Sequence, residues 1–344
     1  MALFGRAAPS HAPRDGRDVI LCDLDGVVYR GALGIEHAVS SLNDAGSNAK
    51  IAYLTNNASR TTEDVATQLQ NLGLHAEPND VVTSAQAAVR VLSAQVKPGA
   101  RVLVVGGRGL RDEVSQAGFF IASSADDEPD AVIQGFAPDV SWNDLAEACY
   151  ALGGTTESER PWIATNTDWT IPRERGLAPG NGTLVSAVHT AVGRLPIVAG
   201  KPELPIFATA RDRFSARNPL FIGDRLDTDV KGAVRANIDS ALVLTGVDGP
   251  KQLISAQPDE RPTYILSDLR GLAEPYPEVR VERGGTVRVG AACVTIEGND
   301  VRILSDGGTP RGKDNIDLLR AACRAIWSSS ISLYGLNVPE RLYQ

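Results

Sequence analysis

The chain has 344 residues, which is too long for one ordinary hydrophobic core and predicts two domains or slightly more. Its composition, 43% hydrophobic and 22% charged, is that of a globular protein and excludes the disordered, collagen and coiled-coil classes. The formal net charge of -8 provides no overall attraction to nucleic acid or to anionic membranes, so we expect neither as a partner. Any phosphate group must therefore be bound by a local site.

The cysteines and the N-terminal segment indicate a soluble cytoplasmic protein. Four cysteines lie far apart and form no CxxC pair, so the sequence predicts neither a zinc site nor a disulfide framework. Residues 1–16 contain no apolar signal segment, and we expect them to be disordered. No later stretch approaches the roughly 18 apolar residues of a membrane span.

From Asp18 onwards the sequence alternates short apolar runs with helical patterns, which is typical of a parallel sheet covered by helices. Apolar residues at three- and four-residue spacing predict crossover helices, the first through Val39, Leu42 and Ala45. The clearest predicted strands end in Gly, Asp or Asn, or just beyond Gly; they are VILCDLDG, KIAYLTNN, ARVLVVGG, DAVIQGF and NPLFIGDR.

The expected fold class is α/β, with a Rossmann-like parallel-sheet core, an inserted α/β cap and a small C-terminal α+β unit. We expect residues 17–85 and 197–272 to form the core and residues 86–196 to form the inserted domain. After Arg270 the sequence changes to apolar and polar alternation around Gly-rich turns, which predicts antiparallel strands and then a helix in residues 273–344. We expect this last unit to be dispensable for chemistry unless it covers an apolar face of the core.

The strongest local signal is DLDG at residues 23–26, directly after an apolar run. Residues i and i+2 of a strand point to the same face, so Asp23 and Asp25 would lie together at the carboxyl edge of the sheet. Two carboxylates there repel each other unless a cation or a proton neutralises them, and hard oxygen ligands favour Mg²⁺ at neutral pH. An EF-hand loop is not supported, because Val27 and Gly34 stand where it requires acidic residues.

Three further segments place polar side chains at predicted strand ends. GDRLDTD supplies Asp224 and Asp229, LTNN supplies Thr55, and GKP supplies Lys201. A hydroxyl and an ammonium group are poor core residues at such positions but good donors to phosphate oxygens.

The order Asp-x-Asp, Thr, Lys, Gly-Asp-x4-Asp resembles the four motifs of the haloacid dehalogenase (HAD) superfamily. The segments DLDGVVYRG, TNNASRT and ATNTDWTIPRERGLAPGNG resemble its group of glycerol-3-phosphate, phosphoglycolate, p-nitrophenyl and NagD-like nucleotide phosphatases. The resemblance covers about residues 18–270 and implies a large cap of the C2 type between the Thr and Lys motifs. The resemblance offers no counterpart for the C-terminal unit, residues 273–344.

The resemblance implies that Asp23 is the nucleophile and Asp25 the general acid and then general base. Phosphate would be held by Thr55, Asn56, Asn57 and Lys201, although a capping or turn role is equally expected for the two asparagines. Mg²⁺ would be bound by Asp23, Asp25 through its carbonyl, and Asp224, with Asp229 supporting this set. In the cap, Asp168 and Arg173 are weaker candidates for substrate contact.

The implied function is Mg²⁺-dependent hydrolysis of small phosphorylated metabolites, with glycerol 3-phosphate first. The acid at position 25 favours phosphate esters over halides, because an alkoxide leaving group needs a proton and a halide does not. Phosphoglycolate, nucleotide or sugar phosphates are the alternatives, followed by a phosphoprotein substrate or a catalytically silent scaffold, and a homodimer is left open. A dinucleotide-binding fingerprint is not indicated by the segment VVGGRGLRD, since Asp112 occupies the third glycine position.

Overall fold

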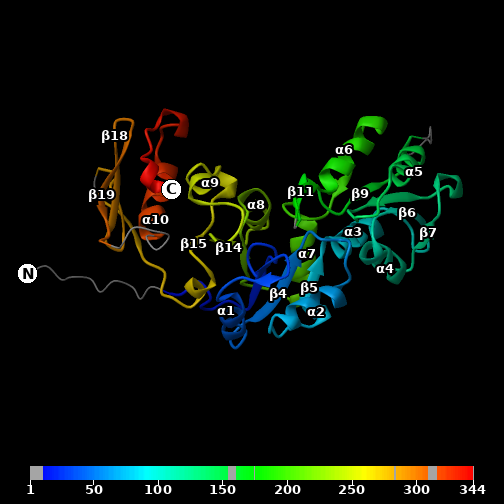
Figure 1. Cartoon of the computed structure of the whole chain (residues 1–344), viewed down its shortest axis with the longest axis horizontal. Coiled ribbons are helices and arrows are strands. Elements are labelled where there is room, and N and C mark those ends of the chain that lie inside the picture. Colours follow the sequence, from blue (N-terminus) through cyan, green and yellow to red (C-terminus); the bar gives the residue numbers. More distant parts are fainter. Residues whose placement is uncertain (1–10, 154–159, 174, 283, 309–315, 344) are drawn as a thin grey trace, which may run out of the picture.

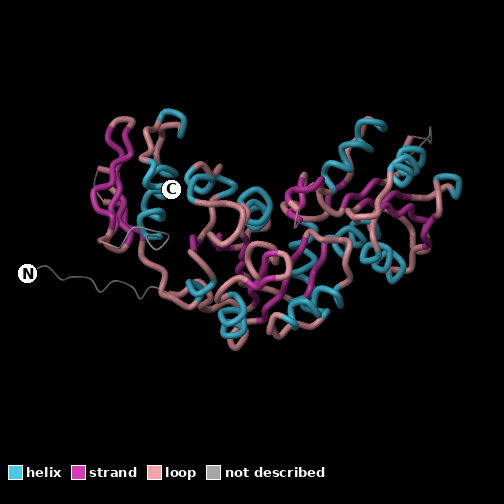
Figure 2. Tube along the Cα trace, viewed as in Figure 1, coloured by secondary structure: helices cyan, strands magenta, loops and turns pink. Residues whose placement is uncertain are grey.

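The computed structural model describes residues 11–153, 160–173, 175–282, 284–308 and 316–343. The chain forms three units in a row, with the C-terminal unit at one end, the core in the middle and the inserted cap at the other end (Figures 1 and 2). The expected α/β class and the parallel sheets are confirmed. No helix in these described ranges is long and apolar enough to cross a membrane.

The core is a six-stranded parallel sheet in the order β15-β14-β13-β1-β4-β5. Alternate residues of each strand face opposite sides, so Val19 and Leu21 pack towards α3 and α7, whereas Ile20 and Cys22 pack towards α1 and α2. The strands are β1 Val19–Cys22, β4 Lys50–Thr55, β5 Val81–Thr83, β13 Leu220–Gly223, β14 Asp239–Val243 and β15 Tyr264–Leu266. The helices are α1 Ala38–Ala45, α2 Thr62–Asn71, α3 Ser84–Ser93, α7 Leu204–Phe214, α8 Lys231–Arg235 and α9 Pro250–Ile254, and β2 Tyr29–Arg30 with β3 Leu33–Gly34 forms a small hairpin.

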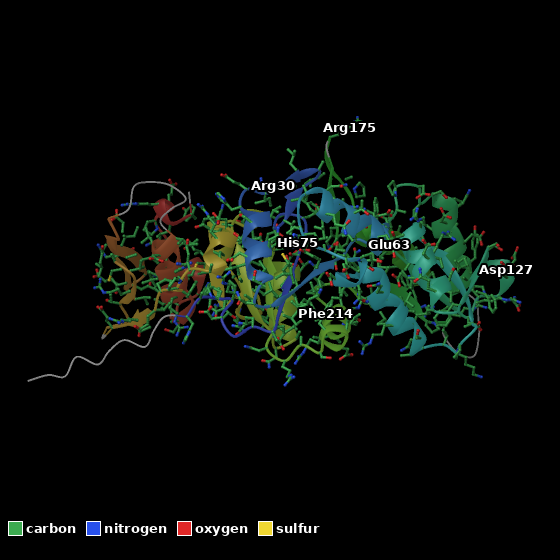
Figure 3. All side chains as sticks on the ribbon, turned by 90° about the horizontal axis from the view of Figure 1, so that it is seen from below. Arg30, Glu63, His75, Asp127, Arg175 and Phe214 are labelled. Atoms are coloured by element: carbon green, nitrogen blue, oxygen red, sulfur yellow. The ribbon has the colours of Figure 1, made fainter. Side chains whose placement is uncertain are left out.

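The inserted cap has its own parallel sheet, in the order β12-β9-β8-β6-β7. Its strands are β6 Arg101–Val105, β7 Phe120–Ala122, β8 Ala131–Gln134, β9 Trp162–Ala164 and β12 Ile197–Val198, and its helices are α4 Arg108–Gln116, α5 Trp142–Leu152 and α6 Asn181–Val192. A hairpin of β10 Thr170–Arg173 and β11 Gly176–Pro179 carries the exposed Arg175, which stands away from the body of the molecule in Figure 3.

The cap sheet extends beyond the cap limits expected from the sequence. β12 pairs with β9 through Ile197 and Val198, two residues past the expected limit at 196. At the other limit, α3 begins at Ser84 and its buried face belongs to the apolar cluster shared by both sheets. The first crossing is therefore built into the packing between core and cap, whereas the second passes through the partly exposed β12.

The beginning of the chain differs from its expected disorder. Residues 1–10 lie outside the described part, but residues 11–16 form a turn against the core, with hydrogen bonds from Arg14 N to Leu272 O and from Tyr276 N to His11 O. Arg14 also pairs with Asp44 of α1. The expectation of disorder for residues 11–16 was therefore wrong, because long-range contacts order a segment without a periodic pattern.

The C-terminal unit has the expected antiparallel strands and a helix. β16 Val279–Val281, β17 Val287–Val289, β18 Ala292–Glu297 and β19 Asp300–Asp306 form a meander, and α10 Ile316–Ser328 lies between this sheet and the core. Leu319 and Cys323 of α10 share one apolar cluster with Leu253 and Ile265 of the core. The unit thus covers an apolar face of the core, the condition under which it is not dispensable.

Arg320 of α10 is the main polar link between this unit and the core. Its guanidinium donates from Nε and Nη2 to the Ile265 carbonyl at 3.0 and 2.7 Å, and pairs with Asp317 at 2.8 Å. It also lies 4.3 Å from the centre of the Tyr276 ring, within the range of a cation–π contact.

We expect Arg320→Ala to lower the free energy of unfolding by about 2 kcal/mol, because the buried Ile265 carbonyl loses its charged partner. Thermal and urea unfolding would measure this. The matched control is Arg324→Ala on the exposed side of the same helix, with an expected change within about 0.5 kcal/mol. Equal stability of the two variants would contradict the assigned role of Arg320.

Candidate active site

Three carboxylates converge at the carboxyl edge of the core sheet. Asp23 follows β1 and Asp224 follows the neighbouring β13, and the Asp23 N–H donates to Ile222 O at 2.8 Å. One carboxylate oxygen each from Asp23, Asp224 and Asp229 lies within 4.8 Å of the others. Neighbouring parallel strands therefore bring together acids that are about 200 residues apart in the sequence.

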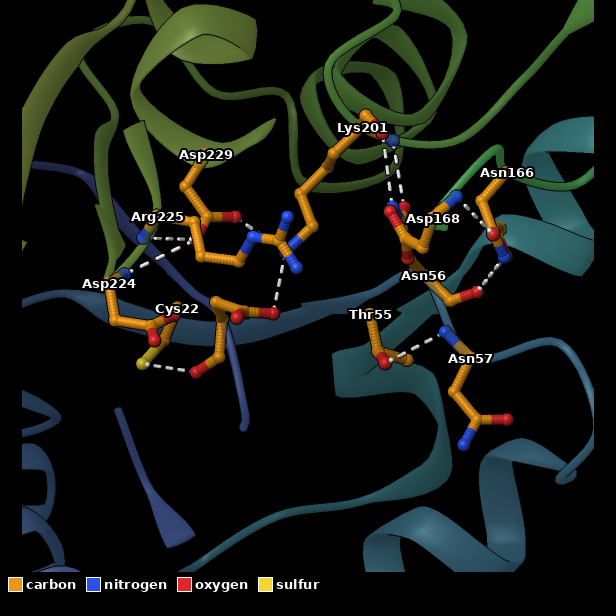
Figure 4. Close-up of polar contacts among 12 residues, drawn as sticks. Cys22, Thr55, Asn56, Asn57, Asn166, Asp168, Lys201, Asp224, Arg225 and Asp229 are labelled. Atoms are coloured by element: carbon orange, nitrogen blue, oxygen red, sulfur yellow. Dashed lines mark hydrogen bonds and ion pairs between the residues drawn. The ribbon is translucent and has the colours of Figure 1, made fainter. Parts of the chain in front are cut away.

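Lys201 lies between two of these acids, Asp23 and Asp229, and Figure 4 labels Lys201 and Asp229. Its Nζ is 2.5 Å from Asp23 Oδ1 and 2.7 Å from Asp229 Oδ1, and only 3% of the residue is exposed. Burial alone would lower the pKa of Lys201, but the ion pairs with Asp229 and Asp23 outweigh it and raise the pKa. The side chain is therefore a fixed ammonium group.

The acids carry more negative charge than this single ammonium offsets. Burial, followed by repulsion from Asp229, raises the pKa of Asp224 to about 7. Burial also raises the pKa of Asp23, with a partial counter-effect from Lys201. A proton or a further cation would neutralise the excess charge of such a site.

Asp224 fits a divalent metal ion. Its Oδ2 accepts a hydrogen bond from Val247 N at 2.7 Å, while its Oδ1 is buried and has no hydrogen-bond partner among the residues that the structure describes. A buried carboxylate oxygen without a donor is costly unless a cation binds it. Together with Asp23, this oxygen gives the hard anionic ligands that Mg²⁺ prefers.

Two glycines make room for the Asp224 carboxylate. A Cβ on Gly246 would lie 1.9 Å from Asp224 Oδ2, and one on Gly26 would lie 2.2 Å from the same oxygen. Gly26 also has a φ of +85°, in the left-handed region where a side chain is strained. The glycine in DLDG thus serves both the turn after β1 and the position of Asp224.

Asp229 differs from the other two acids because both of its oxygens are already engaged. Oδ1 pairs with Lys201, and Oδ2 accepts from the N–H groups of Asp224 and Arg225 at 3.2 and 3.1 Å. The residue comes from a single π-helical turn, Leu226–Val230, directly after β13. Asp229 can therefore fix Lys201 and the Asp224 backbone, as expected of a supporting residue.

Asp25 and Thr55 lie at the same sheet edge. Asp25 remains exposed, unlike Asp23, yet the surrounding protein removes part of its hydration and raises its pKa, with Lys201 and Arg60 counteracting. Thr55 is buried at the end of β4, and its Oγ1 accepts from Asn57 N at 3.1 Å. An accessible carboxyl beside buried charges has the access that proton transfer to a bound molecule requires.

The two asparagines after Thr55 have different contacts. The side-chain oxygen Oδ1 of Asn57 accepts from Ser59 N and Ser59 Oγ, both at 2.9 Å, which is a local turn contact. The Asn56 amide instead bonds to the backbone of Lys201 and to Asp168. Both side chains thus make structural contacts, and the phosphate contact expected for them stays a prediction.

The cap reaches this region through the segment after β9. Asp168 is half-buried, and burial raises its pKa, while Arg225 counteracts. Asn166, which the sequence analysis overlooked, donates from Nδ2 to Asn56 O at 2.7 Å. Its signal was present, since polar residues follow β9 as they follow β1 and β4. The side chain of Arg173 lies outside the described part.

The glycine-rich segment after β6 has a packing role. A Cβ on Gly109 would lie 2.3 Å from the Arg60 carbonyl oxygen, and Gly109 N donates to Ser59 O at 3.2 Å. This loop of the cap therefore packs directly on the core loop that follows Thr55, which explains its glycines without a bound nucleotide.

Comparison with known proteins agrees with this geometry. A family model described as haloacid dehalogenase-like hydrolase matches residues 20–120, and a second HAD-hydrolase-like model matches residues 198–272. D-glycerol 3-phosphate phosphatase of Mycobacterium tuberculosis is 41% identical over 318 residues, which cover 91% of this chain and 86% of that protein. The chain belongs to the haloacid dehalogenase-like hydrolases. The expected resemblance is confirmed.

Solved structures of this family extend the likeness to the fold. Glycerol phosphate phosphatase of M. tuberculosis in complex with magnesium has a TM-score of 0.83 and 38% identity, covering 96% of this chain and 94% of that one. The 4-nitrophenylphosphatase of Thermotoga maritima has a TM-score of 0.70 and 28% identity, covering 76% and 98%. An acid sugar phosphatase of Staphylococcus aureus is 35% identical over 255 residues, covering 72% and 94%.

These coverages correct one expectation about the C-terminal unit. The family models end at residue 272, but a match over 96% of the chain leaves only about 14 residues outside it. Most of residues 273–344 therefore has a counterpart in the M. tuberculosis glycerol phosphate phosphatase. The sequence motifs do not indicate this counterpart, because the HAD motifs all lie before the unit.

We expect Gly246→Ala to weaken Mg²⁺ binding by about tenfold or more, because its methyl group would displace the Asp224 carboxylate. Isothermal titration of the purified protein with Mg²⁺ would measure the loss. Gly249→Ala is the matched control, since its Cβ would meet only Gln252 Oε1, at 3.7 Å. Similar Mg²⁺ affinities for both variants would argue against Asp224 as a ligand.

Proposed function

We propose that this protein hydrolyses small phosphate monoesters with Mg²⁺ and that glycerol 3-phosphate is its preferred substrate. The observation that carries this proposal is the buried set at one sheet edge: Asp23 paired with Lys201, next to Asp224 with an unpartnered oxygen. The set offers a nucleophile, a fixed positive charge and a place for a metal ion, which phosphoryl transfer requires together.

In the first step a carboxylate oxygen of Asp23 attacks phosphorus. The bond between phosphorus and the ester oxygen breaks, which leaves an aspartyl phosphate on Asp23 and an alkoxide leaving group. Asp25, protonated at this stage, gives its proton to the alkoxide. The raised pKa of Asp25 is in line with this role, and its exposed position gives it access to the leaving group.

In the second step the aspartyl phosphate is hydrolysed. Asp25, now a carboxylate, takes a proton from a water molecule whose oxygen attacks phosphorus. The bond between phosphorus and Asp23 breaks, and inorganic phosphate leaves. The same residue thus serves as acid and then as base, and both Asp23 and Asp25 return to their starting states.

Charge neutralisation makes this attack of an anion on an anion feasible. Lys201 contributes an ammonium held by Asp23 and Asp229, and Thr55 places a hydroxyl at the same edge. Asp23 and Asp224, with the Asp25 carbonyl, would hold Mg²⁺, which when bound supplies positive charge to the phosphate oxygens.

The substrate order rests on the relatives. The chain matches the M. tuberculosis D-glycerol 3-phosphate phosphatase over 91% of its length, including most of the C-terminal unit. The acid sugar phosphatases match only 72% of the chain. This supports glycerol 3-phosphate ahead of phosphoglycolate, sugar phosphates and nucleotides, and ahead of phosphoproteins.

We expect Asp23→Asn to keep the fold and to remove turnover, since an amide is a far poorer nucleophile than a carboxylate. Initial rates with p-nitrophenyl phosphate and Mg²⁺ would measure the loss, and Asp212→Asn on the surface is the control. A variant that retains more than about 10% of the wild-type kcat, a barrier change below about 1.4 kcal/mol, would refute the assignment.

We expect kcat/KM to be highest for glycerol 3-phosphate, lower for phosphoglycolate and lowest for a phosphotyrosyl peptide. The reason is steric, because Asn56 links Asp168 of the cap to the Lys201 backbone, and we expect a cap segment held this near the site to hinder a large leaving group. Steady-state kinetics with the three substrates at one Mg²⁺ concentration would test this. Equal or higher efficiency with the peptide would favour the phosphoprotein alternative.

A further inference from the structure

Asn56 joins three segments that are distant in the sequence. It follows Thr55 at the end of β4, and its backbone carbonyl accepts from Ser84 Oγ and from Asn166 Nδ2, both at 2.7 Å. Ser84 begins α3, close to where the chain leaves the core sheet, and Asn166 follows β9 of the cap sheet. The Asn56 backbone is therefore fixed from both the core and the cap.

The Asn56 side chain forms a closed pair of hydrogen bonds with one backbone unit. Its Oδ1 accepts from Lys201 N at 2.8 Å, and its Nδ2 donates to Lys201 O at 3.0 Å. Nδ2 also donates towards both carboxylate oxygens of Asp168, at 3.2 Å each. An amide suits this position because it offers one acceptor and two donors to three partners.

Close packing keeps these contacts in place. A Cβ on Gly200, the residue before Lys201, would lie 2.6 Å from Asn56 Oδ1 and 2.4 Å from Thr165 O. The Lys201 backbone is thus enclosed by Asn56 on one side and the end of β9 on the other. Its side chain extends from this enclosed backbone to Asp23 and Asp229.

We propose that Asn56 is a positioning residue, which sets the Lys201 backbone against the Asp168 segment of the cap so that the ammonium reaches both Asp23 and Asp229. This role rests on the proposed phosphatase function. It differs from the phosphate contact expected from the sequence, because Asn56 acts through Lys201. A displacement of about 1 Å in a catalytic group can cost about 100-fold in rate, so the effect of losing Asn56 is measurable.

The test compares Asn56→Ala, Lys201→Ala and the double variant. The substrate is p-nitrophenyl phosphate, whose leaving group needs no proton, so Asp25 is not required as the acid in the first step. We expect Asn56→Ala to lower kcat by about 10- to 100-fold with a smaller change in KM. The double variant should be no more than about threefold slower than Lys201→Ala, because both changes remove one function.

Asn43→Ala is the matched control. This asparagine also joins two segments, through Nδ2 to Gly73 O at 2.9 Å and Oδ1 to His75 N at 3.3 Å, but it lies on α1 away from the carboxylates. It should leave kcat unchanged. If the losses from Asn56→Ala and Lys201→Ala instead multiply in the double variant, Asn56 does not act through Lys201 and the proposal is wrong.

Two further arms keep the result decisive. If Asn56→Ala does not fold, Asn56→Asp keeps the shape and the acceptor for Lys201 N but removes both donors, and the same kcat loss and non-multiplicative result are expected. Calorimetric binding of inorganic phosphate in Mg²⁺ buffer needs no turnover. We expect Asn56→Ala to bind phosphate about fivefold more weakly than the wild type. The double variant should bind phosphate no more weakly than Lys201→Ala.

The phosphate-binding measurement separates the proposed phosphatase function from the proposed role of Asn56. If the wild-type protein hydrolyses none of the tested esters, the proposed function fails, while the phosphate affinities still decide the role of Asn56. If the wild type is active and Asn56→Ala equals it in both kcat and phosphate affinity, only the role of Asn56 is overturned.

Discussion

The active-site structure depends on the burial of three carboxylates around a single ammonium group. With all groups ionised, Asp23, Asp224 and Asp229 exceed Lys201 by two negative charges, and burying each unpaired charge costs several kcal/mol. The backbone N–H groups of Asp224 and Arg225 donate to Asp229 and reduce this cost. Most of the charge that remains uncompensated is that of the Asp224 carboxylate. A divalent cation would offset this charge without protonation of the acids, so its binding favours the structure of the site as well as its chemistry.

The parallel sheet explains why much of the site was predictable from sequence. A strand's period of two and the common edge of β1, β4 and β13 determine where Asp23, Thr55 and Asp224 lie, and both features are visible as local patterns. The five strongest apolar runs all became strands. The roles assigned to the side chains remain predictions, although the structure brings the expected residues to one edge.

Other features depend on contacts that no local pattern encodes. Asn56 and Asn57 are adjacent and chemically identical, yet the side chain of Asn56 bonds across to Lys201 and that of Asn57 bonds to Ser59. Gly246 has no motif around it, and its importance comes from the Asp224 carboxylate that it approaches from 22 residues away. The order in residues 11–16 likewise comes from contacts with distant parts of the core.

The C-terminal unit shares an apolar cluster with the turn that carries Asp229. Leu226 and Val230 begin and end the turn that carries Asp229, and both belong to the apolar cluster that contains Leu319 and Cys323 of α10. Side chains in a close-packed cluster resist displacement, so the position of this turn depends partly on α10. Because Asp229 in turn fixes the Lys201 ammonium, the site relies on packing that residues 17–272 do not supply alone.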